Sequence, residues 1–286
     1  MGNVYGLVQR KGGVGKTTSA GTLAVEFALR KKARTLAIEM DTQRNLSNGL
    51  GINLDSAREA AEKQARQEQK AISVVEAFPS IYEVLFQPEF GIGYATYQTQ
   101  NFGIDILPAV AAMSGAEHDL SDAIARESRL KAALREAGTD KYVVEVQAAD
   151  LYPATFIDSP PSLGLLTMNV LAASDYVLIP CDISSYALES VPEVLAAVEL
   201  IKRINRTLKV GGIFCTKYDA RNKLSENILQ ELRTRFGALV FDTVIPLNTR
   251  IAEAPVVHLP IQVYDAQSSS ALAYRQLAQE IEARCP

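Results

Sequence analysis

The sequence predicts an α/β fold, a doubly wound and mostly parallel β-sheet with helices on both faces. Short apolar runs alternate with longer helical patterns along all 286 residues, and such alternation builds parallel strands joined by crossover helices. Several runs are apolar at every position, which is typical of strands that are covered on both faces. The composition, 48% hydrophobic and 22% charged, is ordinary for a globular protein, and no apolar run reaches the ~18 residues of a membrane span.

In chain order, the apolar runs are predicted to form strands and the stretches between them to form helices. The predicted strands are Val4–Val8, Thr35–Ile38, Ile104–Leu107, Thr155–Ile157, Tyr176–Ile179, Val210–Phe214 and Val240–Ile245. The predicted helices are Thr18–Arg30, Ala57–Ala77, Glu117–Glu136, Leu188–Ile204, Leu224–Phe236 and Ser269–Ala283. Ligands of such sheets bind beyond the carboxyl ends of the strands, so we expect functional residues directly after strands.

Two segments depart from this alternation. Ser56–Ala71 is rich in Ala, Glu, Gln, Lys and Arg, which gives high helix propensity with a thin apolar stripe, so we expect a protruding helix. Thr139–Thr155 is expected to be an irregular surface excursion. Neither segment has the character of a domain boundary, and we predict one domain over residues 1–286 with insertions near 56–80 and 137–154.

The cysteines and histidines argue against two classes of protein. Cys181, Cys215 and Cys285 are odd in number and far apart, which disfavours a disulfide framework and favours a reducing cytoplasm. With His118 and His258 as the two histidines, and no Cys or His at metal-binding spacing, a zinc site is not expected. The amino-terminal segment has no apolar core, so we do not expect it to be a secretory signal.

Charge is distributed unevenly within a chain of net charge −4. Residues 151–200 carry six acids and no Lys or Arg, whereas residues 201–250 carry ten Lys and Arg against four acids. A locally basic segment can form a surface for a polyanion. A solvated helix face is the alternative, and charge alone favours that alternative.

A glycine-rich turn follows the first predicted strand and leads into a helix. Glycines let backbone N–H groups close around phosphates at the positive end of a helix. In such a turn Lys16 would reach the β- and γ-phosphates, and the Thr17 hydroxyl would bind Mg²⁺. The strict phosphate-loop pattern needs Gly where Arg10 stands, and the turn has instead a second lysine at its start, either solvated or reaching a nucleotide on a second subunit. The predicted nucleotide-binding residues here are Lys11, Gly12, Gly13, Val14, Gly15, Lys16, Thr17 and Thr18.

The turn and three later segments resemble the ParA/MinD family of deviant Walker-A ATPases, most closely its ParA (Soj-like) branch. The segment Glu39–Asn45 is similar to the family pattern D-x-D-P-Q-G-N. Ile157–Gly164 is similar to I-D-x-P-P-S-L-G, and Val244–Pro255 to V-I-P-R-N-V-R-x-x-E-A-P. The resemblance covers nearly the whole chain except Ser56–Ala71 and about 139–152. It implies a P-loop NTPase of the SIMIBI type with ATP and Mg²⁺ as cofactors.

The resemblance also implies roles for individual residues. Asp41 would orient or deprotonate the attacking water, although a strand-end cap is the alternative, and Lys11 and Lys16 would complete the catalytic set. Asp158 ends an apolar strand, where it would hold Mg²⁺ through a water together with Thr17. Glu39 replaces the first acid of the family pattern, in a role that we expect to be structural. The family holds adenine at Thr216, Pro246 and Asn248, and it places Asn169 near the switch region at the dimer interface.

In ParA-like proteins the second lysine implies an ATP-sandwich dimer, in which each Lys11 reaches the partner's phosphates. The resemblance further implies non-specific DNA binding by that dimer and slow hydrolysis until a ParB-like protein stimulates it, in the cytoplasm at the nucleoid. The matching DNA-binding positions are Arg221 and Arg250, and Leu247 replaces a cation that is frequent in the family. Possible helpers are Lys202, Arg203, Arg206, Lys217 and Lys223.

Three other functions share this loop. A membrane-cycling, MinD-like ATPase needs a basic amphipathic tail, and Leu277–Pro286 is short and acidic, so we expect no membrane partner. An electron-transfer ATPase of the nitrogenase iron-protein type needs cysteines that bridge a cluster, and the three cysteines are wrongly placed for that. An ATPase that positions a protein cluster rather than DNA has the same chemistry and stays open.

Overall fold

The computed structural model describes residues 2–87, 91–99, 102–135, 151–184 and 186–286. Its centre is a sheet of eight strands in the order β3-β4-β2-β5-β1-β6-β7-β8. Only β3 runs antiparallel to its neighbour, β4, and the other described pairs are parallel. The predicted α/β fold class is confirmed. The strands are β1 (Asn3–Leu7), β2 (Thr35–Glu39), β3 (Tyr97–Gln98), β4 (Ile104–Leu107), β5 (Ala154–Asp158), β6 (Tyr176–Asp182), β7 (Lys209–Tyr218) and β8 (Val240–Pro246).

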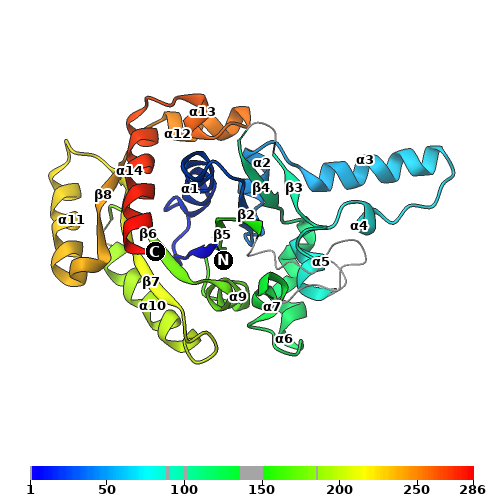
Figure 1. The fold of residues 1–286 in the computed structure, drawn as a ribbon, viewed down its shortest axis with the longest axis horizontal. Helices are drawn as coiled ribbons and strands as arrows, with labels where there is room; N and C mark the ends of the chain where they lie inside the picture. The colour runs from blue at the N-terminus through cyan, green and yellow to red at the C-terminus, as the bar shows by residue number, and fades with distance from the viewer. Residues whose placement is uncertain (1, 88–90, 100–101, 136–150, 185) are drawn as a thin grey trace.

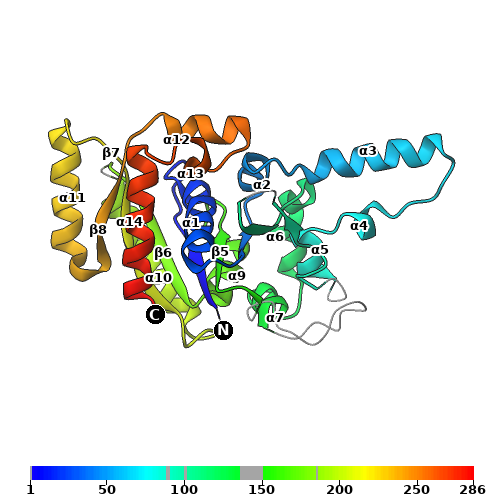
Figure 2. The same ribbon diagram turned by 45° about the horizontal axis from the view of Figure 1, so that its top comes forward.

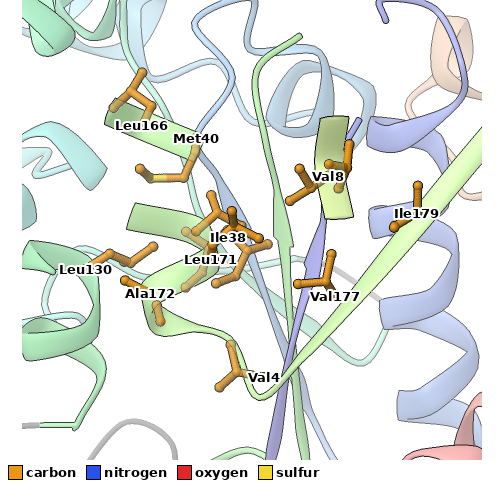
Figure 3. Close-up of a cluster of buried hydrophobic side chains, with 14 of the residues drawn as sticks. Val4, Val8, Ile38, Met40, Leu130, Leu166, Leu171, Ala172, Val177 and Ile179 are labelled. Atoms are coloured by element: carbon orange, nitrogen blue, oxygen red, sulfur yellow. The ribbon is translucent and has the colours of Figure 1, made fainter. Parts of the chain in front are cut away.

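Helices cover both faces of the sheet (Figure 1). One face packs on α1 (Lys16–Lys31) and α14 (Ser269–Arg284), around Tyr5, Phe27 and Phe156. The opposite face packs on a second group of helices, and Figure 3 shows part of this core, with Val4, Ile38 and Val177 of the strands beside Leu171 and Ala172. These helices are α5 (Ile81–Phe86), α6 (Ala116–Ser121), α7 (Arg129–Arg135), α9 (Leu165–Ala173), α10 (Ala187–Ile201) and α11 (Lys223–Phe236).

Strand register brings the predicted functional positions to one edge of the sheet. Asp158, the last residue of β5, pairs with Leu7 of β1 and with Glu39 of β2. On the other side of β1, Asp182 at the end of β6 pairs with Thr216 of β7. The loop from β1 to α1 therefore lies between two strand-end carboxylates, at the edge where parallel sheets bind ligands.

The predicted helix Ala57–Ala77 is wrong in its extent. The chain forms α3 (Leu54–Gln67) and the single turn α4 (Val74–Ala77), separated by residues that include Gln69 at a φ of +52°. Figures 1 and 2 show α3 projecting away from the sheet and its covering helices. Helix propensity is high along the whole segment, but residues 68–73 are all exposed, so no packing holds them helical.

The predicted helix Glu117–Glu136 is also interrupted. It forms α6 and α7 with a turn between them in which Ala125 has a φ of +55°. The Asn169 amide of α9 donates to the Arg126 carbonyl at 2.7 Å and accepts from the Leu130 N–H at 3.2 Å, so a tertiary contact stabilises the break. Glu136 lies outside the described residues.

Several elements were not predicted from the sequence. The helix α9 and the strand β3 are among them, with the short helices α2 (Asn45–Gly49), α12 (Arg250–Glu253) and α13 (Ile261–Tyr264). Most of the predicted irregular segment Thr139–Thr155 lies outside the described residues, and β5 begins at Ala154. Among the helices that the structure describes, none combines the length and the hydropathy that crossing a bilayer requires. The single domain with two insertions stays a prediction.

Candidate nucleotide-binding site

The loop between β1 and α1 has the backbone geometry of an anion cradle. Gly13 and Gly15 adopt left-handed φ values of +74° and +89°, which residues with a Cβ rarely adopt. Gly15 is the N-cap of α1, and neither a side-chain cap nor an acidic residue occupies the first turn of that helix. The positive end of α1 is therefore open to an anion, and the backbone N–H groups of the loop are its natural donors.

Lys16 supplies a fixed cation inside this loop. Lys16 is the first residue of α1, and it is 5% exposed. Its ammonium donates a hydrogen bond to the Lys11 carbonyl at 3.2 Å. Burial lowers the pKa of Lys16, while the nearby carboxylates of Asp158 and Asp41 act in the opposite direction. An additional anion in the loop would satisfy the remaining donors of this ammonium.

Asp158 is the most unusual polar group of the site. It is fully buried at the end of β5, and among the described residues neither of its carboxylate oxygens has a hydrogen-bond partner. Burial raises the pKa of Asp158, and the Glu39 and Asp41 carboxylates add to this effect, whereas Thr17 and Lys16 oppose it. A buried carboxylate without partners is unfavourable unless a cation compensates it. A carboxylate beside a threonine hydroxyl is a suitable donor set for Mg²⁺, so the residues present fit that ion.

Asp41 begins the turn that follows β2. The residue is 6% exposed, and its Oδ1 accepts a hydrogen bond of 3.0 Å from the backbone N–H of Gln43. Asp41 therefore does cap the strand end, and it also lies close enough to Lys16 and Asp158 to influence the pKa values of both. The hydrogen bond from Gln43 explains the orientation of Oδ1. It does not decide whether the carboxylate also acts on a bound nucleotide.

Glu39 organises the surroundings of Asp41. Its Oε1 accepts from the backbone N–H groups of Leu46 at 2.7 Å and Ser47 at 3.2 Å, at the start of α2. Its Oε2 accepts from the Ala109 N–H at 3.2 Å, after β4. Burial raises the pKa of Glu39, and these hydrogen bonds to the charged form oppose that shift. The side chain joins β2, α2 and the loop after β4, which is a structural role.

Of the residues predicted to hold adenine, Thr216 lies near the end of β7, Pro246 ends β8 and Asn248 follows it. The Thr216 hydroxyl donates to the Val14 carbonyl at 2.8 Å, so this side chain anchors the phosphate loop. Pro246 ends β8, and the Asn248 amide donates to Ser269 Oγ and accepts from the Arg250 N–H at 2.9 Å. These three residues lie at the same edge of the sheet as the loop. Asn169, predicted near a dimer interface, is 0% exposed and bonds within its own chain.

Lys11 lies at the mouth of the loop. Its ammonium donates to Asp182 Oδ2 at 2.6 Å and to Ser184 Oγ at 3.0 Å. It also lies 5.4 Å from the ring centroid of Tyr186. Sequence reasoning missed Asp182 and Ser184 as neighbours of this loop. The available signal was an acid at the end of an apolar run, here Tyr176–Cys181, and the same signal identified Asp158.

The structure divides the predicted DNA-binding residues. Arg221 and Arg250 follow β7 and β8 at the carboxyl edge, with side chains that are 88% and 53% exposed. Each is paired in its own chain, Arg221 with Asp219 at 2.9 Å and Arg250 with Glu253 at 3.0 Å. Lys217 and Lys223 lie at the same edge. The helpers Lys202, Arg203 and Arg206 precede β7, whose ten residues span ~33 Å, so they lie at the other end of the sheet.

Comparisons with known proteins agree with this geometry. The AAA_31 family model, described as an AAA domain, matches residues 2–210. The chain is 38% identical over 285 residues to the chromosome-partitioning ATPase Soj of Treponema pallidum, across 99% of this chain and 98% of the relative. It is 34% identical over 282 residues to the chromosome partitioning protein ParA of Caulobacter vibrioides, across 98% and 94%.

A solved structure with the same fold carries a nucleotide. Cobyrinic acid a,c-diamide synthase of Mycobacterium smegmatis, with a bound ATP analogue and magnesium, matches with a TM-score of 0.74 and 28% identity, over 98% of this chain and 93% of that chain. Fold and family match together define a P-loop ATPase of the ParA/MinD type. Within that class, the chain belongs to the Soj/ParA family of partitioning ATPases.

Proposed function

We propose that this protein is an ATP-driven switch for DNA segregation. With ATP and Mg²⁺ it forms a dimer that encloses two nucleotides, this dimer binds DNA without sequence preference, and a ParB-like protein stimulates hydrolysis and release. The observation that carries the proposal is the buried, unpartnered carboxylate of Asp158 beside Lys16 and the open N-terminus of α1. Mg·ATP would supply an anion for the Lys16 ammonium and the helix N-terminus, and a cation for the Asp158 carboxylate.

Each residue of the site then has a defined task. The backbone of Gly12–Thr18 and the Lys16 ammonium hold the phosphates, and Asp158 with Thr17 holds Mg²⁺, which neutralises charge on the phosphates when bound. Asp41 orients the attacking water, because its carboxylate is fixed by Gln43 at the strand end. Lys11 reaches the partner's phosphates, and Thr216, Pro246 and Asn248 border the adenine.

The proposed DNA surface consists of Arg221, Arg250, Lys217 and Lys223 at the carboxyl edge of the sheet. Exposed cations of this kind neutralise backbone phosphates without reading bases, so binding is non-specific and depends on salt. In the cell this places the dimer at the nucleoid. Leu247, 60% exposed beside these cations, replaces the family's arginine and is expected to weaken the interaction.

The same exposed leucine favours one second candidate, the positioning of a protein cluster. Loss of a cation at this position reduces the attraction for a phosphate backbone, whereas contact with a protein surface does not require that cation. A MinD-like membrane cycle has less support, because Leu277, Ile281 and Cys285 at the end of α14 are buried against the sheet rather than free for a bilayer.

Sedimentation of the wild type and of Asp41→Ala with saturating ATP and Mg²⁺ tests the switch. The variant keeps the phosphate-binding groups but loses the carboxylate that orients water, so we expect a stable dimer with ATP turnover reduced by about 100-fold or more. The wild type is expected to dimerise transiently. A variant that binds ATP and stays monomeric would contradict the proposal.

The trapped dimer also tests DNA binding. We expect Asp41→Ala to be retained on arbitrary duplex DNA with ATP and released with ADP, with an affinity that falls steeply as salt rises. The double variant Arg221→Ala/Arg250→Ala in the same background is expected to dimerise but not to be retained. If Asp41→Ala dimers are not retained on DNA even at low salt, this result would contradict DNA binding and favour the protein-cluster candidate.

A further inference from the structure

The three-residue cluster Lys11, Asp182 and Ser184 is a closed hydrogen-bonding unit. The Lys11 ammonium donates to Asp182 Oδ2 at 2.6 Å and to Ser184 Oγ at 3.0 Å. The Ser184 hydroxyl in turn donates to Asp182 Oδ1 at 2.9 Å, and the Ser184 N–H bonds to the Asp182 carbonyl at 2.9 Å. Both carboxylate oxygens of Asp182 are thereby used, and the lysine is held in one direction.

The position of this cluster is determined by the sheet. Asp182 ends β6 in register with Thr216, whose hydroxyl anchors the phosphate loop through the Val14 carbonyl. The side chains of Lys11 and Asp182 are 33% and 18% exposed, so water screens their ion pair only partly. One residue earlier, Arg10 pairs with Glu193 of α10 at 2.9 Å. The two cations that open the loop are both directed toward the β6–α10 segment of the same chain.

We propose that Asp182 and Ser184 hold Lys11 in an inactive position, so that ATP-dependent dimerisation requires release of this lysine. The inference rests on the proposed function, in which the same ammonium reaches a nucleotide on the second subunit. Lys11 leaves Asp182 only when a stronger anion is offered across the interface. An ATP γ-phosphate in the partner meets that condition, whereas an empty or ADP-bound partner does not.

The arrangement sets a threshold for dimerisation, with Asp182 as a positioning residue. A dimer contains two such lysines, so the cost of releasing each one enters the dimerisation constant twice. If a partly screened ion pair with a supporting hydroxyl contributes about fivefold to the equilibrium, its removal strengthens the dimer by roughly 25-fold.

The variant Asp182→Asn tests this inference, measured by sedimentation over a range of protein concentrations with a non-hydrolysable ATP analogue and Mg²⁺. We expect its dimer dissociation constant to be about 25-fold below that of the wild type. Ser184→Ala removes the hydroxyl but keeps the carboxylate, and it is expected to shift the constant in the same direction by about threefold. Glu199→Gln, which removes an acid of α10 that pairs with Lys202 instead, is the matched control with no expected shift.

The outcomes separate this inference from the function on which it rests. A wild type that stays monomeric with the analogue overturns the proposed dimer itself. A wild type that dimerises, with Asp182→Asn equal or weaker, overturns the inactive position of Lys11 alone. Analogue binding to each variant, measured below the concentration of dimerisation, verifies that the variants fold and that the shift concerns association.

Discussion

The buried charged residues near the phosphate loop differ from Glu26 in whether Mg·ATP could compensate their charge. Lys16, Asp41 and Asp158 face the phosphate loop, where Mg·ATP would supply opposite charges. Glu26 on α1 is 2% exposed and does not belong to the proposed nucleotide site, so Mg·ATP would not compensate its charge. Its Oε1 has no hydrogen-bond partner among the described residues. Burial raises the pKa of Glu26, while Arg275, Gln262 and Arg30 oppose the shift.

The raised pKa of Glu26 predicts a dependence of stability on pH. Between the ordinary carboxyl pKa and the raised one, the native state binds more protons than the unfolded state, so stability falls as pH rises. Glu26→Gln removes this penalty. We expect the variant to gain on the order of 1 kcal/mol over the wild type at pH 8, which is about 2 °C in Tm, and to lose this advantage near pH 4.

Thermal unfolding of both proteins between pH 4 and pH 8 measures this difference, with Glu199→Gln as the control for loss of an exposed acid. An advantage that does not change with pH would show that the Glu26 charge is not the cause. A variant less stable than the wild type at pH 8 would show that Glu26 is favourably paired.

Elements whose local sequence and packing agree could be predicted, and the rest could not. The strand–glycine turn–helix unit around Gly13 and Gly15 follows from residues that are neighbours in the chain. The breaks at Gln69 and Ala125 depend on the absence of packing in one case and on the Asn169 amide in the other. Neither cause is visible in helix propensity, which is high through both segments.

The projecting helix α3 gives a prediction at the scale of the element. Between residues 59 and 73, all of which the structure describes, only Ala65 is buried. Replacement of residues 60–73 by a short Gly/Ser linker is therefore expected to change Tm by no more than about 2 °C and to leave the proposed ATP-dependent dimerisation intact.

Arg58→Ala is the contrasting control for that deletion. The Arg58 guanidinium donates to the Phe78 carbonyl at 2.7 Å and pairs with Glu83 at 3.0 Å, with side chains that are 14% and 4% exposed. Its loss leaves a buried carboxylate without its cation, and we expect about 2 kcal/mol of destabilisation. If the linker variant unfolds and Arg58→Ala stays folded, residues 60–73 would have a role in folding, which would contradict the prediction.

For the whole molecule, sequence reasoning located the functional edge of the sheet but not its internal contacts. The rule that parallel sheets bind ligands beyond their strands, together with the resemblance, predicted Lys16, Asp41 and Asp158 at one edge, where the structure has them. The same reasoning grouped Arg206 with Arg221, which are close in the sequence. The ten residues of β7 lie between them, and an extended strand of that length separates its two ends by ~33 Å. The contact of Lys11 with Asp182 joins positions 171 residues apart, which local patterns do not connect.

The central claim is that Lys11 exchanges Asp182 for the nucleotide of a second copy when ATP is bound. The most direct measurement is a structure of Asp41→Ala with ATP and Mg²⁺, in which the distance from Lys11 Nζ to the nearest phosphate oxygen of the partner subunit's ATP is determined. We predict a hydrogen-bond distance of about 3 Å and an Asp182 free of Lys11. A dimer with ATP in both subunits and Lys11 still on Asp182 would contradict the claim.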